Sequence, residues 1–149
     1  MPLCGINVAM GNAPANPKIF HITHVYNLRQ IIAAGGIWSD AKRLELNLNC
    51  QIVGMSKIKQ RRLRDVVVQC YPNTHVGDYV PFYFCPRSVM LYILHKGNHP
   101  DVQYSGGQGP MIHLQGDMAT VVRWAQAGPG PVSPVGLQRL QCGCILRPV

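Results

Sequence analysis

The sequence predicts a domain of mixed α and β structure (α/β, or α+β), and three observations support that prediction. Hydrophobic residues make up 47% of the 149 residues, which fits one domain that buries roughly two-thirds of the surface of its unfolded chain. Apolar and polar residues alternate in "KIFHIT" and in "MIHLQ", as they do in strands. Between and after these stretches, apolar residues recur every three or four positions, which indicates helices.

The charge balance favours a polyanionic partner. Fourteen Lys and Arg against six Asp and Glu give a net charge of +8, which attracts nucleic acid but says nothing about the fold. The six cysteines lack the paired spacing of a zinc site, so we expect reduced or core thiols and no metal. Without a signal peptide or an apolar run long enough to cross a bilayer, we expect a cytoplasmic protein with no membrane partner.

The chain begins with a loose segment, residues 1–17, that shows no periodicity. "KIFHIT" then predicts a strand, and "THVYNLRQIIAAGG" predicts a helix with Thr23 as its N-cap and Gly35 at its end. The apolar face of this helix would consist of Val25, Leu28, Ile31 and Ile32. Residues 37–50 are less regular, whereas "KIKQRRLRD", with five positive charges in nine residues, predicts a short helix or an ordered loop.

In the middle of the chain, "VVVQCY" predicts a strand, "PNTHVGD" a loop and "YVPFYF" a second strand. The second strand should lie at a sheet edge or bulge, because Pro81 has no N–H to donate to a ladder. Pro86 suits the first position of a helix that runs through "RSVMLYILHK" to Gly97. The apolar run from Met90 to Leu94 predicts that this helix is buried nearly all round.

Towards the C-terminus, "MIHLQ" predicts a strand, and Asp117 can cap a helix through "MATVVRWAQA" that ends at Gly128. The domain would therefore span residues 18–127. Residues 128–149 show no sustained period and are expected to form a divergent, flexible tail. A continuation altered by a frameshift or truncation is the alternative for this end of the chain.

Four segments stand in a particular order: "FHITHVYNL", "QRRLR", "DYVPFYFCPRSVMLYI" and "YSGGQGPMIHL". Together they closely resemble the DarT family, bacterial toxins that use NAD to ADP-ribosylate bases of single-stranded DNA, over about residues 18–117. The resemblance implies an ADP-ribosyltransferase-like fold, in which a split mixed sheet with flanking helices surrounds an NAD cleft, with its C-terminal part incomplete here. It also implies NAD as co-substrate, single-stranded DNA as substrate and a DarG-type macrodomain antitoxin as partner.

The resemblance assigns NAD contacts to several positions. His21, Ile22 and Thr23 match the family's first NAD-contacting motif, and a helix that starts beside Thr23 would offer backbone N–H groups to an anionic dinucleotide. Gln30 and Trp38 fall at further NAD-lining positions. The bulky indole of Trp38 could instead belong to the core.

Arg62, the second arginine of "QRRLR", matches the arginine to which the family assigns a catalytic role. Its planar fork of donors suits the phosphates of NAD, and the family's mechanism also has this arginine assist removal of a proton from the base. Arg61 and Arg64 are expected to face DNA phosphates or solvent.

The family's essential glutamate lies far downstream, where its carboxylate would stabilise the positive charge that develops on the ribose. The one glutamate of this chain, Glu45, precedes the arginine motif, so it does not match the family's downstream glutamate. Asp78 is expected to fix its loop. The sequence therefore predicts a DNA ADP-ribosyltransferase of toxin type whose activity the missing glutamate puts in question. The alternatives are a non-enzymatic basic module that binds nucleic acid or nucleotides, and a basic α/β domain with an unrelated role.

Overall fold

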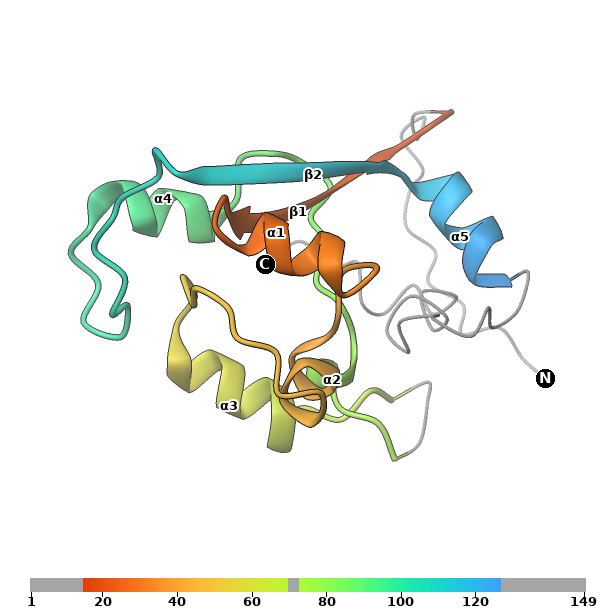
Figure 1. The fold of residues 1–149 in the computed structure, drawn as a ribbon, viewed down its shortest axis with the longest axis horizontal. Helices are drawn as coiled ribbons and strands as arrows, with labels where there is room; N and C mark the ends of the chain where they lie inside the picture. Colours follow the sequence, from red (N-terminus) through yellow and green to blue (C-terminus); the bar gives the residue numbers. More distant parts are fainter. Residues whose placement is uncertain (1–14, 70–72, 127–149) are drawn as a thin grey trace.

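A long antiparallel strand pair organises the fold. The computed structural model describes residues 15–69 and 73–126. In it, β1 (Lys18–His24) pairs with β2 (Met111–Asp117) over seven residues, from Lys18 opposite Asp117 to His24 opposite Met111 (Figure 1). Both strands confirm the prediction from alternation. The helices are α1 (Asn27–Ala33), α2 (Asp40–Glu45), α3 (Ser56–Arg64), the 3-10 turn η1 (Val76–Asp78), α4 (Val89–Lys96) and α5 (Met118–Gln126).

The helices flank this strand pair, so the described residues form a mixed α/β fold. In Figure 1, α1 lies between the strands and the pair α2 and α3, while α4 and α5 lie at opposite ends of the strands. The most deeply buried side chains are Ile19 of β1 and the neighbours Tyr79 and Val80. The core therefore forms where β1 meets the segment that precedes α4.

That segment is not the regular strand predicted from "YVPFYF". Tyr83 alone forms a bridge with Phe20 of β1, in which each backbone N–H donates to the other carbonyl over 2.9 Å. Pro81 cannot donate to a ladder, so the pairing does not extend. The prediction that the segment lies at a sheet edge agrees with this arrangement, because Tyr83 pairs with β1 outside the β1–β2 ladder.

The strand predicted for "VVVQCY" is also wrong within the described residues. Val67 forms an isolated bridge with His75, and the N–H of Val68 donates to the carbonyl of Thr74 over 2.8 Å. The N–H of Val76 donates to the carbonyl of Val66 over 2.9 Å, and η1 begins at that same Val76, so these contacts do not continue into a regular strand.

Helix α1 begins later than predicted. Thr23 is still part of β1, opposite Ile112, so the N-cap position falls to Tyr26, whose side chain makes no capping bond. The predicted apolar face is wrong at Val25 and Ile32, which are 40% and 71% exposed. Gly35 follows the helix with a φ of 75°, as expected for a residue that ends a helix.

Helix α2 was missed by the sequence patterns, although Ser39 caps it by accepting a hydrogen bond from the N–H of Lys42. Helix α3 confirms the prediction of a short helix in the basic run. The N–H of Thr120 donates to Asp117 over 3.1 Å, which confirms the predicted cap of α5. The predicted helix end at Gly128, and the segments 1–14 and 128–149, lie outside the described residues.

Helix α4 differs from its prediction at its start and in its burial. Ser88, rather than the region of Pro86, provides the cap by accepting from the N–H of Leu91. Leu94 is buried but Tyr92 is exposed, so the helix is not buried all round. It ends at Gly97 as predicted, with a φ of 63°.

Two further features hold for residues 15–69 and 73–126. None of their helices combines the length and apolarity needed to cross a membrane. Their His, Cys, Asp and Glu side chains form no group of three that could hold a metal ion.

Gly77 in η1 packs directly against α3. A β-carbon at this position would lie 2.8 Å from Cα and 2.6 Å from Cδ2 of Leu63, so the backbone would have to move. We expect Gly77→Ala to lower the free energy of unfolding by about 1–3 kcal/mol, measured by urea denaturation. Gly109→Ala is the control, because an added β-carbon there meets nothing within 4 Å; equal stabilities of the two variants would contradict this packing.

Candidate functional site

One cleft gathers all the positions to which the resemblance assigned NAD contacts or catalysis. His21, Ile22 and Thr23 line it from β1. The cavity has a volume of about 170 Å³. The other positions that line it are Gln30 of α1, Trp38 of the loop before α2, and Arg62 of α3. Residues far apart in the chain thus share one cavity, while their individual roles stay predictions.

His21 is held as a neutral imidazole. Its Nδ1 lies 2.9 Å from the carbonyl oxygen of Pro81, which can only accept, so Nδ1 carries the proton. Burial lowers the pKa of His21 below its ordinary value, and the hydrogen bond to Pro81 and the charge of Asp40 only partly oppose this shift. The charges of Lys59 and Arg62 lower this pKa further. At neutral pH, Nε2 is therefore an uncharged hydrogen-bond acceptor at the cleft.

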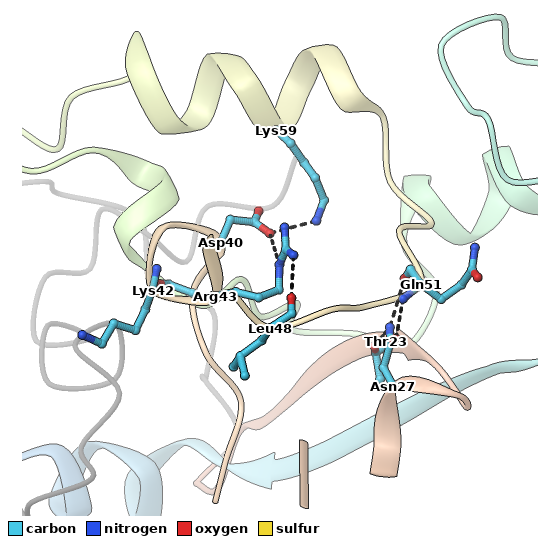
Figure 2. Close-up of polar contacts among 9 residues, drawn as sticks. Thr23, Asn27, Asp40, Lys42, Arg43, Leu48, Gln51 and Lys59 are labelled. Atoms are coloured by element: carbon cyan, nitrogen blue, oxygen red, sulfur yellow. Dashed lines mark hydrogen bonds and ion pairs between the residues drawn. The ribbon is translucent and has the colours of Figure 1, made fainter. Parts of the chain in front are cut away.

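Buried Asn27 connects β1, α1 and the chain that follows α2 (Figure 2). Its Nδ2 donates to Oγ1 of Thr23 over 3.1 Å and to the carbonyl of Gln51 over 3.0 Å. Its Oδ1 accepts from the N–H of Gln51 over 2.6 Å. This side chain fixes two walls of the cleft relative to each other, and the sequence analysis did not identify it, because its partners become apparent only in the fold.

Trp38 serves both the packing and the cleft. Its Nε1–H donates to the carbonyl of Ala34, just after α1, over 3.1 Å. The indole is half-buried and also lines the cavity. The two interpretations offered for this residue, core and site, are therefore compatible.

Arg62 is the cation of α3 that enters the cleft without a protein partner. No hydrogen bond or ion pair engages it within the described residues, whereas Arg61 and Arg64 on the same helix are exposed, as expected. Burial raises the pKa of Tyr83, and the charge of Arg62 opposes that rise. The guanidinium of Arg62 therefore lies close enough to His21 and Tyr83 to influence both electrostatically.

A second set of charges was missed by the sequence analysis. Nζ of Lys59 lies 2.8 Å from Oδ1 of Asp40, and Nε of Arg43 lies 4.0 Å from the same oxygen (Figure 2). Arg43 also donates from Nη1 to the carbonyl of Leu48 over 3.0 Å. All three charged residues line the cleft, and together with Arg62 they give its lining three cations against one carboxylate.

The other carboxylates discussed from the sequence lie elsewhere. Glu45 ends α2, with a side chain that is 64% exposed and paired with Lys42, and it does not line the cleft. Asp78 accepts from the N–H of His75 over 2.8 Å and so fixes its loop, as expected. Among the described residues that line the cleft, Asp40 is the one carboxylate.

A second hollow lies beside the cleft, and Gln51 lines both. Three rings gather at the hollow, since that of His24 lies 4.6 Å from the ring of Tyr26 and 5.5 Å from the ring of Tyr104, between centroids. The lining of this hollow includes no Asp, Glu, Lys or Arg among the described residues. Of the two cavities, the first cleft is therefore the one with cationic side chains for an anionic ligand.

Comparison with known proteins gives a consistent family. Residues 20–128 match the family model described as "ssDNA thymidine ADP-ribosyltransferase, DarT". A DNA ADP-ribosyl transferase of Thermus aquaticus is 41% identical over 101 residues, which are 68% of this chain and 42% of that protein. The chain thus spans less than half the length of this curated relative.

Two solved structures of DarT from Thermus sp. 2.9 share the fold. The complex with ADP-ribosylated ssDNA has a TM-score of 0.63 and 36% identity, over 76% of this chain and 50% of that one. The complex with NAD+ has a TM-score of 0.57 and 35% identity, over 74% and 48% of the two chains.

The Asn27 bridge provides a test of how the cleft is held together. Asn27→Ala would leave the N–H of Gln51 without its acceptor, so we expect a loss of about 2 kcal/mol in the free energy of unfolding. Urea denaturation measures this loss. Asn98→Ala, at an exposed position, serves as the control, and a similar effect of both substitutions would argue against the bridge.

The lowered pKa of His21 predicts a pH dependence of stability. The unfolded chain binds a proton at this residue near pH 6.5, whereas the folded chain binds it only at lower pH, so folding loses free energy as the pH falls below about 6.5. In His21→Asn an amide N–H can still donate to the carbonyl of Pro81, but the titrating group is gone. Stability should therefore fall less between pH 7.5 and pH 5 in this variant, by thermal denaturation; an unchanged pH dependence would contradict the buried neutral imidazole.

Proposed function

Because the chain belongs to the DarT family, we propose that its cleft binds NAD and that the protein is an ADP-ribosyltransferase acting on bases of single-stranded DNA. One observation carries the proposal: the positions that match the family's NAD motifs come from β1, α1, the loop before α2 and α3, yet they line a single cavity. The proposal assigns this function to a domain of residues 18–127.

The donor set of the cleft suits a dinucleotide diphosphate. Three cations against one carboxylate give the lining a net charge of +2, because His21 is neutral at pH 7. A diphosphate carries about two negative charges, and a concave site of opposite charge raises its local concentration. Half-buried Trp38 offers a flat apolar surface to a ring of the ligand.

NAD supplies the ADP-ribosyl group in this reaction, and nicotinamide leaves when its bond to the ribose breaks. We assign His21, Ile22, Thr23, Gln30 and Trp38 to binding NAD, and Arg62 to both binding and catalysis. Arg62 has its donors available, since no protein group among the described residues engages them. They can hold a phosphate, or orient the DNA base whose proton must leave.

The DNA would approach along the exposed side of α3. Lys57, Arg61 and Arg64 are exposed there and can neutralise backbone phosphates without reading the sequence of the bases. Glu45 does not line the cleft, and Asp40 is held in ion pairs with Lys59 and Arg43, so we assign the stabilisation of charge on the ribose to neither.

Family membership supports two further parts of the proposal. A toxin of this kind is paired with a DarG-type macrodomain antitoxin, which removes the modification from DNA. A protein that modifies the DNA of its own cell works in the cytoplasm, and we include that compartment in the proposal.

Transfer of labelled ADP-ribose from NAD to single-stranded oligonucleotides tests the function. We expect little or no transfer by the 149-residue chain, because no carboxylate is assigned to stabilise charge on the ribose, and transfer by a version that carries a glutamate-bearing C-terminal extension of the family. In that extended version Arg62→Ala should lose on the order of 100-fold, the scale of removing one group that stabilises charge in a transition state. Arg64→Ala is the matched control on the same helix, and it should weaken DNA binding in a salt-dependent way while leaving NAD binding intact.

An extended version that binds NAD and single-stranded DNA but transfers no label would replace the transferase by the alternative, a non-enzymatic basic binding module. A chain that binds neither would refute both functions.

A further inference from the structure

Lys59 lies on the same face of α3 as Arg62. The two residues are three positions apart, a spacing that brings side chains together on one side of a helix, and both line the cleft. No motif of the sequence analysis assigned a role to Lys59. Its position raises the question of why a second cation of α3 is directed into the same cavity.

The ammonium of Lys59 has one protein partner and still has free donors. It donates one hydrogen bond, to Oδ1 of Asp40 over 2.8 Å, and it has no other acceptor in the described part of the chain. An ammonium has three donors, so two remain for a ligand. Its side chain is only 27% exposed, and it is one of the residues that line the cavity.

Asp40 is well placed to hold this ammonium still. It lies in the first turn of α2, which Ser39 caps, and its side chain is 13% exposed. Arg43, one turn further along α2, approaches the same carboxylate oxygen. The long side chain of a free lysine loses considerable rotamer entropy when it binds a ligand, and an anchor in the unbound protein reduces that loss.

Lys57, the other lysine of α3, allows a comparison with Lys59. Its side chain is 81% exposed, and it pairs with Asp101 over 2.6 Å outside the cleft. Each of the two lysines of α3 thus has a carboxylate partner, but only the pair of Lys59 and Asp40 faces the cavity. Lys57 is therefore a matched control for charge, helix and pairing.

We propose that Lys59 is a second cation that binds the diphosphate in this cleft, beside Arg62, and that Asp40 is the positioning residue that orients it. This proposal rests on the assignment of the cleft to NAD. Arg62 can approach the diphosphate with a planar fork of donors, whereas Lys59 adds a compact charge. Two cations on one helix face give the diphosphate a defined orientation across the cleft.

The first experiment compares ligands with and without phosphate. Isothermal titration calorimetry of the 149-residue chain would measure the affinities of ADP-ribose, which contains the diphosphate, and of adenosine, which contains none. We expect Lys59→Gln to weaken ADP-ribose about tenfold, the scale of one lost charge-assisted hydrogen bond, with adenosine unchanged. Lys57→Gln should change neither affinity, and Lys59→Arg should retain most of the affinity for ADP-ribose.

The second experiment tests how Asp40 acts. Asp40→Asn should weaken ADP-ribose several-fold in the unchanged background but have no further effect in Lys59→Gln, because a positioning residue acts through its partner. Additive effects, or tighter binding by Asp40→Asn alone, would overturn the positioning role. Thermal denaturation of each variant separates loss of fold from loss of contact.

The outcomes for the two proposals are distinct. If the unchanged chain binds neither NAD nor ADP-ribose, the proposed function fails and this inference fails with it. If the unchanged chain binds both, and Lys59→Gln binds ADP-ribose as tightly as Lys57→Gln does, the NAD cleft stands and the role of Lys59 is refuted.

Discussion

The arrangement of the cleft depends on the pairing of β1 on two sides. The β1–β2 ladder is one side, and on the other Phe20 exchanges two backbone hydrogen bonds with Tyr83. This bridge brings the carbonyl of Pro81 to His21, and that hydrogen bond determines which ring nitrogen carries the proton. The far end of β1 presents Thr23 to Asn27, which connects it to α1 and to Gln51. A few backbone and amide hydrogen bonds thus position groups from four parts of the chain.

The charged residues of the cleft lie on two short helices, α2 and α3. Three cations that line one cavity repel one another, and Asp40 offsets part of that repulsion by pairing with Lys59 and Arg43. Arg62 has no such partner within the described residues. The remaining repulsion among the cations destabilises the cleft without a ligand. A dianionic ligand would reduce this repulsion when it binds. Such conflicts between local stability and charge are typical of functional sites.

The sequence correctly predicted features that depend on residues close together in the chain. The alternation of β1 and β2, the cap at Asp117 and the glycine at the end of α4 all act through neighbouring residues. The cap at Thr23 failed because Thr23 pairs with distant Ile112 in the β1–β2 ladder. The strand through Pro81 failed because this residue has no N–H to extend the single bridge between Tyr83 and Phe20. The site residues were found through a family resemblance rather than through spacing. Lys59 and Asp40 carry no motif, since they meet only when α2 and α3 pack together.

A crystal structure of the chain with ADP-ribose bound would test the central claim most directly. We expect the diphosphate in the cleft between β1, α1 and α3, within hydrogen-bonding distance of the side chains of Arg62 and Lys59. The Nδ1–H of His21 should still donate to Pro81, as it does without ligand. A diphosphate bound elsewhere, for example in the hollow beside Tyr104, with the cleft empty, would contradict the assignment of this cleft to NAD.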